Sequence, residues 1–194
     1  MIKIYVGRIE YRISLLFSAT LVVLLTIDKT GIPAWCIAAS AMHEAGHFAA
    51  MYAFGYRPHL VSVGFFGISV HHREELSGSK AVFIALAGPA VNMVSFVVLF
   101  SVFGWTIPAL VHLIMAIFNL LPIEALDGGQ ALYYLLAELK GAEKAERISF
   151  IVSVLFLMPL ASVGFFLLLK NGYNFTLLGI SIYLGLLLIL KRRR

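Results

Sequence analysis

The sequence predicts an α-helical integral membrane protein with six transmembrane helices and a small membrane-associated β-sheet. Three observations predict this fold class. Of the 194 residues, 61% are hydrophobic and 13% are charged, whereas soluble domains have about 45–50% and about 25%, and the mean hydropathy is +0.94. The apolar residues fall into six separate stretches. The basic residues lie almost entirely at the two ends of the chain and between alternate stretches.

Each apolar stretch approaches the length of about 20 residues that a helix needs to cross a bilayer. The first is the shortest, but no small-residue cleavage site follows its apolar core, so it is interpreted as a retained helix and not as a signal peptide. The expected spans are 13–27, 33–54, 81–103, 105–122, 148–169 and 175–190. We expect them to form a single domain over residues 1–194, without a CBS or PDZ domain.

The Lys and Arg residues predict the orientation, because cytoplasmic loops of membrane proteins are rich in these residues. With six spans, all of the 15 Lys and Arg residues except Lys29 and Lys170 lie on the side of the two termini. A multi-pass protein of the cell membrane with both termini in the cytoplasm is therefore expected. The basic end at 191–194 is interpreted as an anchor to anionic lipid, and no nucleic-acid partner is expected.

Three segments outside the spans have their own patterns. Residues 2–6 and 59–72 are rich in strand-forming residues, and they predict an N-terminal strand and a β-hairpin. Glycines permit the hairpin turn, which is expected at Gly64, Phe65, Phe66 and Gly67. Because an open strand edge cannot face lipid, this sheet is expected at the membrane surface or under cover. Residues 128–141 predict a helix that leaves the membrane at its charged end.

A His-Glu-Ala-Gly-His pentad lies inside the second apolar stretch, at residues 43–47. On a helix, this spacing places His43 and His47 one turn apart on the same face, with Glu44 close by. Ionisable side chains are costly inside a bilayer, and no Lys or Arg lies within an expected span to neutralise them. The pentad predicts two zinc ligands and a general base. The structural alternative is a set of interhelical hydrogen bonds.

A catalytic zinc ion takes three protein ligands and keeps a fourth position for water. Asp127 is the best candidate for the third ligand, because the two glycines after it let the backbone bend and bring the carboxylate to the metal. Glu124 is the competing carboxylate, or else a substrate-recognition or interfacial charge. His112 is more simply a hydrogen-bonded helix residue. One zinc ion per chain would activate a water molecule, from which Glu44 takes a proton.

These motifs resemble, in order and spacing, the site-2 protease family of intramembrane zinc metalloproteases, peptidase family M50. Besides the pentad, the chain has the Gly-Pro-x-x-Asn element of this family at 88–92 and its Asn-x-x-Pro…Leu-Asp-Gly element at 119–128. The number of spans, the N-terminal strand and the hairpin resemble the branch that contains the sporulation protease SpoIVFB. In that branch a CBS domain often follows the last helix, and none is expected here.

The resemblance implies hydrolysis of a peptide bond within or next to a transmembrane segment. It implies that His43, His47 and Asp127 hold the zinc ion and that Glu44 is the general base. Residues expected to position the substrate are Asn92, Asn119, Gly64, Phe65, Phe66 and Gly67. The alternative role for Asn92 is to cap a contact between helices. The expected partners are the lipid bilayer and a membrane protein or membrane-tethered pro-protein as substrate. The resemblance also leaves room for a regulatory membrane partner.

Two other functions compete with this interpretation. A CAAX-processing type of membrane protease needs a Glu-x-x-x-Asp element in a later span, and the chain has no such pair there. The other alternative is a catalytically silent or differently gated membrane protein that binds or transports metal. A transporter tends to have paired broken helices in two similar halves, which the sequence lacks. A silent homologue would usually have lost Glu44 or one of the histidines.

Overall fold

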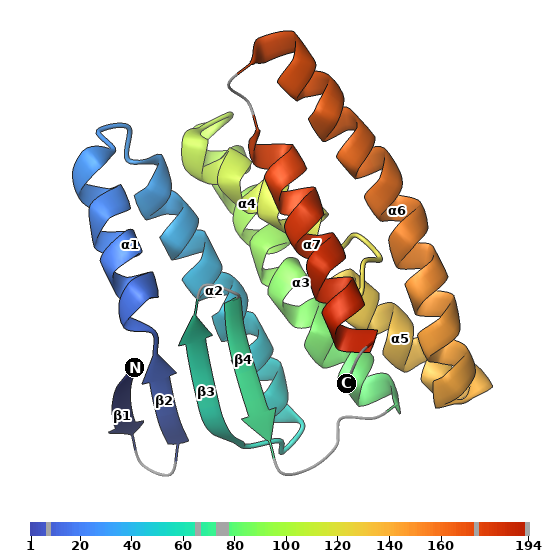
Figure 1. Cartoon of the computed structure of the whole chain (residues 1–194). Coiled ribbons are helices and arrows are strands. Elements are labelled where there is room, and N and C mark those ends of the chain that lie inside the picture. The colour runs from blue at the N-terminus through green and yellow to red at the C-terminus, as the bar shows by residue number, and fades with distance from the viewer. Residues whose placement is uncertain (7–8, 65–66, 73–77, 173–174, 193–194) are drawn as a thin grey trace. The chain divides into compact units, whose positions relative to one another are not determined.

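The computed structural model describes residues 1–6, 9–64, 67–72, 78–172 and 175–192, and within these residues it has four strands and seven helices (Figure 1). In chain order they are β1 (Ile2–Val6), β2 (Ile9–Ile13), α1 (Leu15–Ile27), α2 (Ile32–Ala53), β3 (Pro58–Gly64), β4 (Gly67–His72), α3 (Gly78–Phe103), α4 (Ile107–Asn119), α5 (Asp127–Lys140), α6 (Ala142–Asn171) and α7 (Thr176–Arg192).

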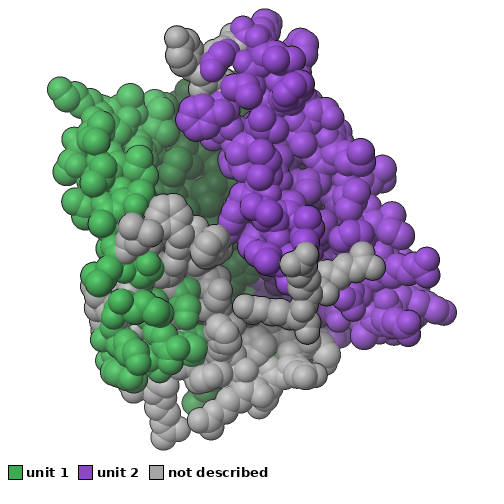
Figure 2. Space-filling view, viewed as in Figure 1, with its two compact units in different colours: residues 1–76, 91–115 green, residues 77–90, 116–194 purple. Residues whose placement is uncertain are grey.

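The chain divides into two compact units, coloured separately in Figure 2. Unit 1 consists of residues 1–76 and 91–115, and unit 2 of residues 77–90 and 116–194. Helices α3 and α4 are continuous, and each contributes residues to both units. Unit 1 contains the strands with α1 and α2, whereas unit 2 contains α5, α6 and α7.

The four strands of unit 1 form one sheet in the order β1-β2-β3-β4. Strands β1 and β2 are antiparallel, β2 and β3 are parallel, and β3 and β4 are antiparallel. Parallel neighbours need a long crossover, and here α1 and α2 supply it. The strand β2 is a correction to the sequence interpretation, because it takes up Ile13, where the first span was expected to begin. Its period-2 alternation of apolar and charged residues explains the strand.

Helix α2 begins at a sharply defined turn. Gly31 has a φ of 74°, a conformation that favours glycine, and its N–H donates to Asp28 Oδ2 at 3.0 Å. A proline follows in the first turn of the helix, where its missing N–H costs nothing. The buried residues of α2 include Ala39, His43 and Gly46. Because they are spaced by four and three positions, they share one face of the helix.

Two helices, α3 and α6, are long and apolar enough to cross a membrane. Shorter apolar helices cover 18–27, 107–119 and 176–190. Large apolar side chains are exposed on the long helices, for example Phe103 and Phe166, which suits lipid and not water. These features indicate a membrane protein, whereas the number of crossings and their orientation stay predictions. The expected and observed ends of the fourth stretch differ, because the span was expected at 105–122 and its helix ends at Asn119.

In unit 2, the segment between α4 and α5 is part of the core. Ile123 and Leu126 are buried together with Leu184 of α7. The segment is also tied to α6, because the Glu124 N–H donates to Ser153 Oγ at 2.9 Å and that hydroxyl donates to the Ser149 carbonyl at 2.7 Å. An irregular segment that satisfies its backbone groups in this way can be buried. It leads directly into Asp127.

Candidate metal centre

Helix α2 carries two histidines whose imidazole rings lie next to each other. His43 and His47 are one turn apart, and their Nε2 atoms are 3.1 Å apart. Two ligands of a tetrahedral zinc ion, each bound at about 2.0–2.1 Å, are about 3.3 Å apart, so the pair fits a shared metal with little movement. His43 is buried, with 6% of its surface exposed, and His47 is half-buried. Glu44, the next residue after His43, is also half-buried.

Asp127 is the first residue of α5 in unit 2. The residue before it, Leu126, donates its N–H to the Ile123 carbonyl at 2.7 Å and so closes a turn. A Cβ atom on Gly128 would overlap the Leu120 carbonyl, and one on Gly129 would overlap the Ile123 carbonyl.

These contacts correct the expected role of the glycine pair. Neither glycine has a positive φ, so they do not serve as a backbone bend. Gly128 and Gly129 instead allow the first turn of α5 to lie directly against the preceding segment. This close approach holds Asp127 at the start of the helix.

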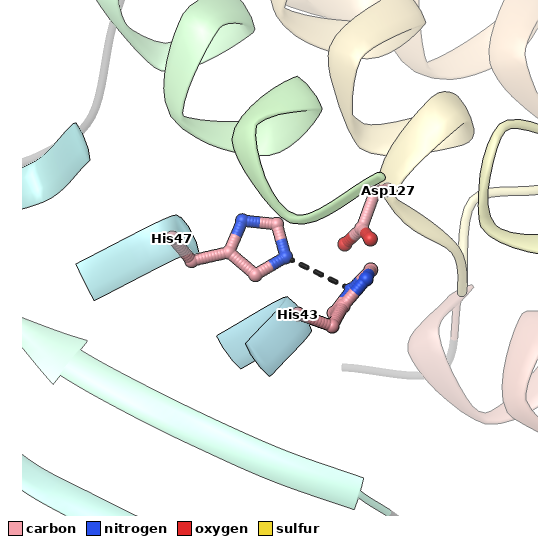
Figure 3. A group of neighbouring side chains, drawn as sticks. All are labelled: His43, His47 and Asp127. Atoms are coloured by element: carbon pink, nitrogen blue, oxygen red, sulfur yellow. Dashed lines mark hydrogen bonds between the residues drawn. The ribbon is translucent and has the colours of Figure 1, made fainter. Parts of the chain in front are cut away.

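His43, His47 and Asp127 form a group that could hold a metal ion (Figure 3). Each offers one ligand atom, and these atoms lie within 4.8 Å of one another. Two imidazole nitrogens and a carboxylate oxygen are a donor set that suits zinc. Within the part of the chain that the structure describes, Glu124 does not belong to this group. Glu124 is buried and lines a cavity of about 610 Å³ in unit 2, together with Arg147 and other residues.

Asn92, on α3, is completely buried and lies between two histidines. Its Nδ2 is 3.1 Å from His43 Nδ1, and its Oδ1 is 3.0 Å from His112 Nδ1. The simpler interpretation of His112, a hydrogen-bonded helix residue, agrees with this contact. The connection of His112 to His43 through Asn92 was not foreseen from the sequence, although an ionisable residue in an apolar helix was a signal for it.

The remaining candidate residues are placed as follows. Asn119 is the half-buried last residue of α4. Gly64 and Gly67 pair with each other at the ends of β3 and β4. Phe65 and Phe66 lie outside the described residues. A role of these residues in positioning a substrate therefore stays a prediction.

Among the comparisons with known proteins, the family match covers one of the sequence motifs, the element at 119–128. Residues 102–160 match the model of peptidase family M50. A protein of Synechocystis sp. that is named as a candidate zinc metalloprotease is 37% identical over 68 residues, which are 35% of this chain and 19% of that protein. The chain thus spans about one fifth of the length of that relative.

The fold is similar to the solved structure of a site-2 protease from Methanocaldococcus jannaschii. The TM-score is 0.65, the sequence identity is 20%, and the similarity covers 94% of this chain and 91% of that chain. This similarity concerns the fold and covers nearly the whole chain, whereas the family match covers residues 102–160. Residues 102–160 therefore match peptidase family M50, and the chain has a fold similar to that of a site-2 protease.

Proposed function

We propose that this chain is an intramembrane zinc metalloprotease that hydrolyses a peptide bond within or next to a transmembrane segment of a membrane-tethered substrate. The observation that carries the proposal is the group of His43, His47 and Asp127, with Glu44 in the same helix as the histidines. One zinc ion held there would supply Lewis acidity, which polarises a peptide carbonyl and lowers the pKa of water to about 7.

We assign the metal-binding and proton-transfer roles to four residues of the chain. His43 and His47 would hold the zinc ion through Nε2, and Asp127 would hold it through a carboxylate oxygen. Glu44 takes a proton from the attacking water and delivers it to the leaving nitrogen. The carbon–nitrogen bond breaks, and the products are a carboxylate and an amine.

The sheet of unit 1 supports a way to hold the substrate. A peptide bond inside a helix is already hydrogen-bonded, so the helix must unwind before cleavage. Strand β4 is at one end of the described sheet, and an extended peptide can pair with such an edge. The substrate we propose is a membrane protein or membrane-tethered pro-protein in the lipid bilayer, with room for a regulatory membrane partner. The uneven distribution of Lys and Arg supports cytoplasmic termini.

The test compares wild type with Glu44→Gln in proteoliposomes that contain a labelled single-span substrate. We expect the substitution to lower cleavage at least about 100-fold, because general acid–base groups contribute about 10²–10⁴-fold. Zinc content should stay at one ion per chain, since Glu44 is not a ligand. The matched control is Glu143→Gln, at the exposed start of α6, which should cleave like wild type.

Equal cleavage by wild type and Glu44→Gln would contradict the proposal. If both bound zinc and neither cleaved any of a panel of single-span substrates, a metal-binding or transport protein would be the better interpretation. Zinc flux into the same vesicles would distinguish transport from binding alone.

A further inference from the structure

Three buried side chains from three helices of unit 1 form a continuous hydrogen-bonded chain. His43 of α2, Asn92 of α3 and His112 of α4 are connected by contacts of 3.1 Å and 3.0 Å. Their exposed fractions are 6%, 0% and 5%. His43 contacts Asn92 through its Nδ1 atom, whereas its Nε2 atom faces His47. The side of His43 that does not face the other ligand is therefore held by Asn92.

The direction of these hydrogen bonds matters for metal binding. A histidine that binds a metal through Nε2 carries its proton on Nδ1 and must donate it. The amide of Asn92 has one accepting end and one donating end. A half-turn of this amide exchanges the two ends and keeps both hydrogen bonds, provided that the two histidines change their tautomers with it.

Only one of the two directions suits a metal ligand. If His43 Nδ1–H donates to Asn92 Oδ1, then Asn92 Nδ2–H donates to His112 Nδ1, and His43 Nε2 carries no proton and can bind a metal. In the opposite direction, His112 Nδ1–H donates to Oδ1 and Nδ2–H donates to His43 Nδ1, and the amide atoms have this placement in the structure. The proton of His43 is then on Nε2, where it blocks the metal, so metal binding requires the half-turn of the Asn92 amide. The tautomer of His112 is thus coupled to that of His43.

We propose that His112 is a positioning residue of the metal centre, which acts through Asn92 to set the tautomer and ring orientation of His43. The proposal rests on the proposed function only in taking His43 as a metal ligand. His112 suits this role because its Nδ1 can either accept or donate. Ala109 and Ala116 lie on the same face of α4 as His112 and are completely buried. His112 is therefore on a face of the helix that packs against protein.

The test measures zinc affinity of the full chain in detergent by competition with a chelator. His112→Leu and His112→Asn are a matched pair of similar shape, and only the asparagine keeps a polar atom near the position of Nδ1. We expect His112→Leu to weaken zinc binding about 10–100-fold, the usual effect of losing a partner of a ligand histidine. His112→Asn should stay close to wild type. Equal affinity in all three proteins would overturn the proposal.

A second measurement separates positioning from a general packing effect. Aspartate at position 92 can only accept, so it holds the His43 proton on Nδ1 whatever residue is at position 112. In the Asn92→Asp background, His112→Leu should therefore weaken zinc binding much less than in wild type. A packing defect would cause the same loss in both backgrounds, and that result would overturn the proposal even if His112→Leu alone folds poorly.

The tautomer can also be observed directly. In the zinc-bound wild type, ¹⁵N NMR of the His43 ring should show a proton on Nδ1, and a proton on Nε2 would contradict the proposal. These measurements do not depend on proteolysis. A chain that binds zinc through His43 but cleaves nothing would refute the proposed function and leave this inference standing.

Discussion

The two histidines in unit 1 and the aspartate in unit 2 are held by different kinds of local structure. His43 and His47 lie in an uninterrupted helix, and the helical period alone sets their spacing. Asp127 follows an irregular segment, and its position depends on two glycines that let backbone approach backbone. The comparison teaches that the histidine pair needs only a helix, whereas the aspartate depends on residues that have no functional group of their own.

The largest expected effect separates two carboxylates of unit 2, Asp127 and Glu124. Asp127→Asn should lower zinc affinity at least about 100-fold, because removing a ligand costs more than the 10–100-fold loss of a supporting residue. Glu124→Gln, the matched substitution, should keep one zinc ion per chain. Metal analysis of both purified proteins checks this. Loss of zinc in Glu124→Gln with retention in Asp127→Asn would exchange their roles.

A smaller effect is expected from the backbone contact beneath Asp127. In Gly129→Ala the new Cβ would overlap the Ile123 carbonyl, and overpacking of this kind costs about 1–3 kcal/mol. Unfolding in detergent should show this loss, together with weaker zinc binding. Gly179→Ala is the control, since a Cβ there meets nothing within 4 Å, and alanine favours a helix over glycine by about 1 kcal/mol. Equal stability of the two variants would show that the contact can relax.

The smallest effect concerns the sheet of unit 1. Arg12 donates to Glu10 at 2.8 Å and lowers the pKa of that carboxyl below its ordinary value, with a lesser contribution from Lys3. Because the folded pKa is lowered, the stabilisation is complete above the ordinary carboxyl range and is lost as the pH falls through the lowered pKa. Both side chains are partly exposed, so the change in stability should be slight.

Carboxyl NMR titration checks this prediction. Arg12→Met should raise the pKa of Glu10 toward its ordinary value, and Lys3→Met should raise it less. A larger rise in Lys3→Met would contradict the order of the two contributions.

The prediction from sequence was most accurate where a regular period or a spacing decides the structure. Helices cover most of each of the six apolar stretches, and a further helix occupies 127–140. It was less accurate at the bounds. Strand β2 was not expected, because the strand pattern at 9–13 runs directly into an apolar helix, and its last residue, Ile13, was assigned to the first span. The end of α4 at Asn119 was also missed, since the apolar sequence continues beyond it.

By itself, the sequence determined the helical membrane class, the position of the pentad and the pairing of its histidines. Composition and the helical period can be read from the chain without knowing which distant segments touch. Only the tertiary structure decided how the glycines after Asp127 are used and which residues support His43. The two glycines leave room for backbone carbonyls that lie several residues earlier in the sequence. Asn92 and His112 come from two other helices. Contacts between distant segments leave no period in a sequence, so they appear only when the chain is folded.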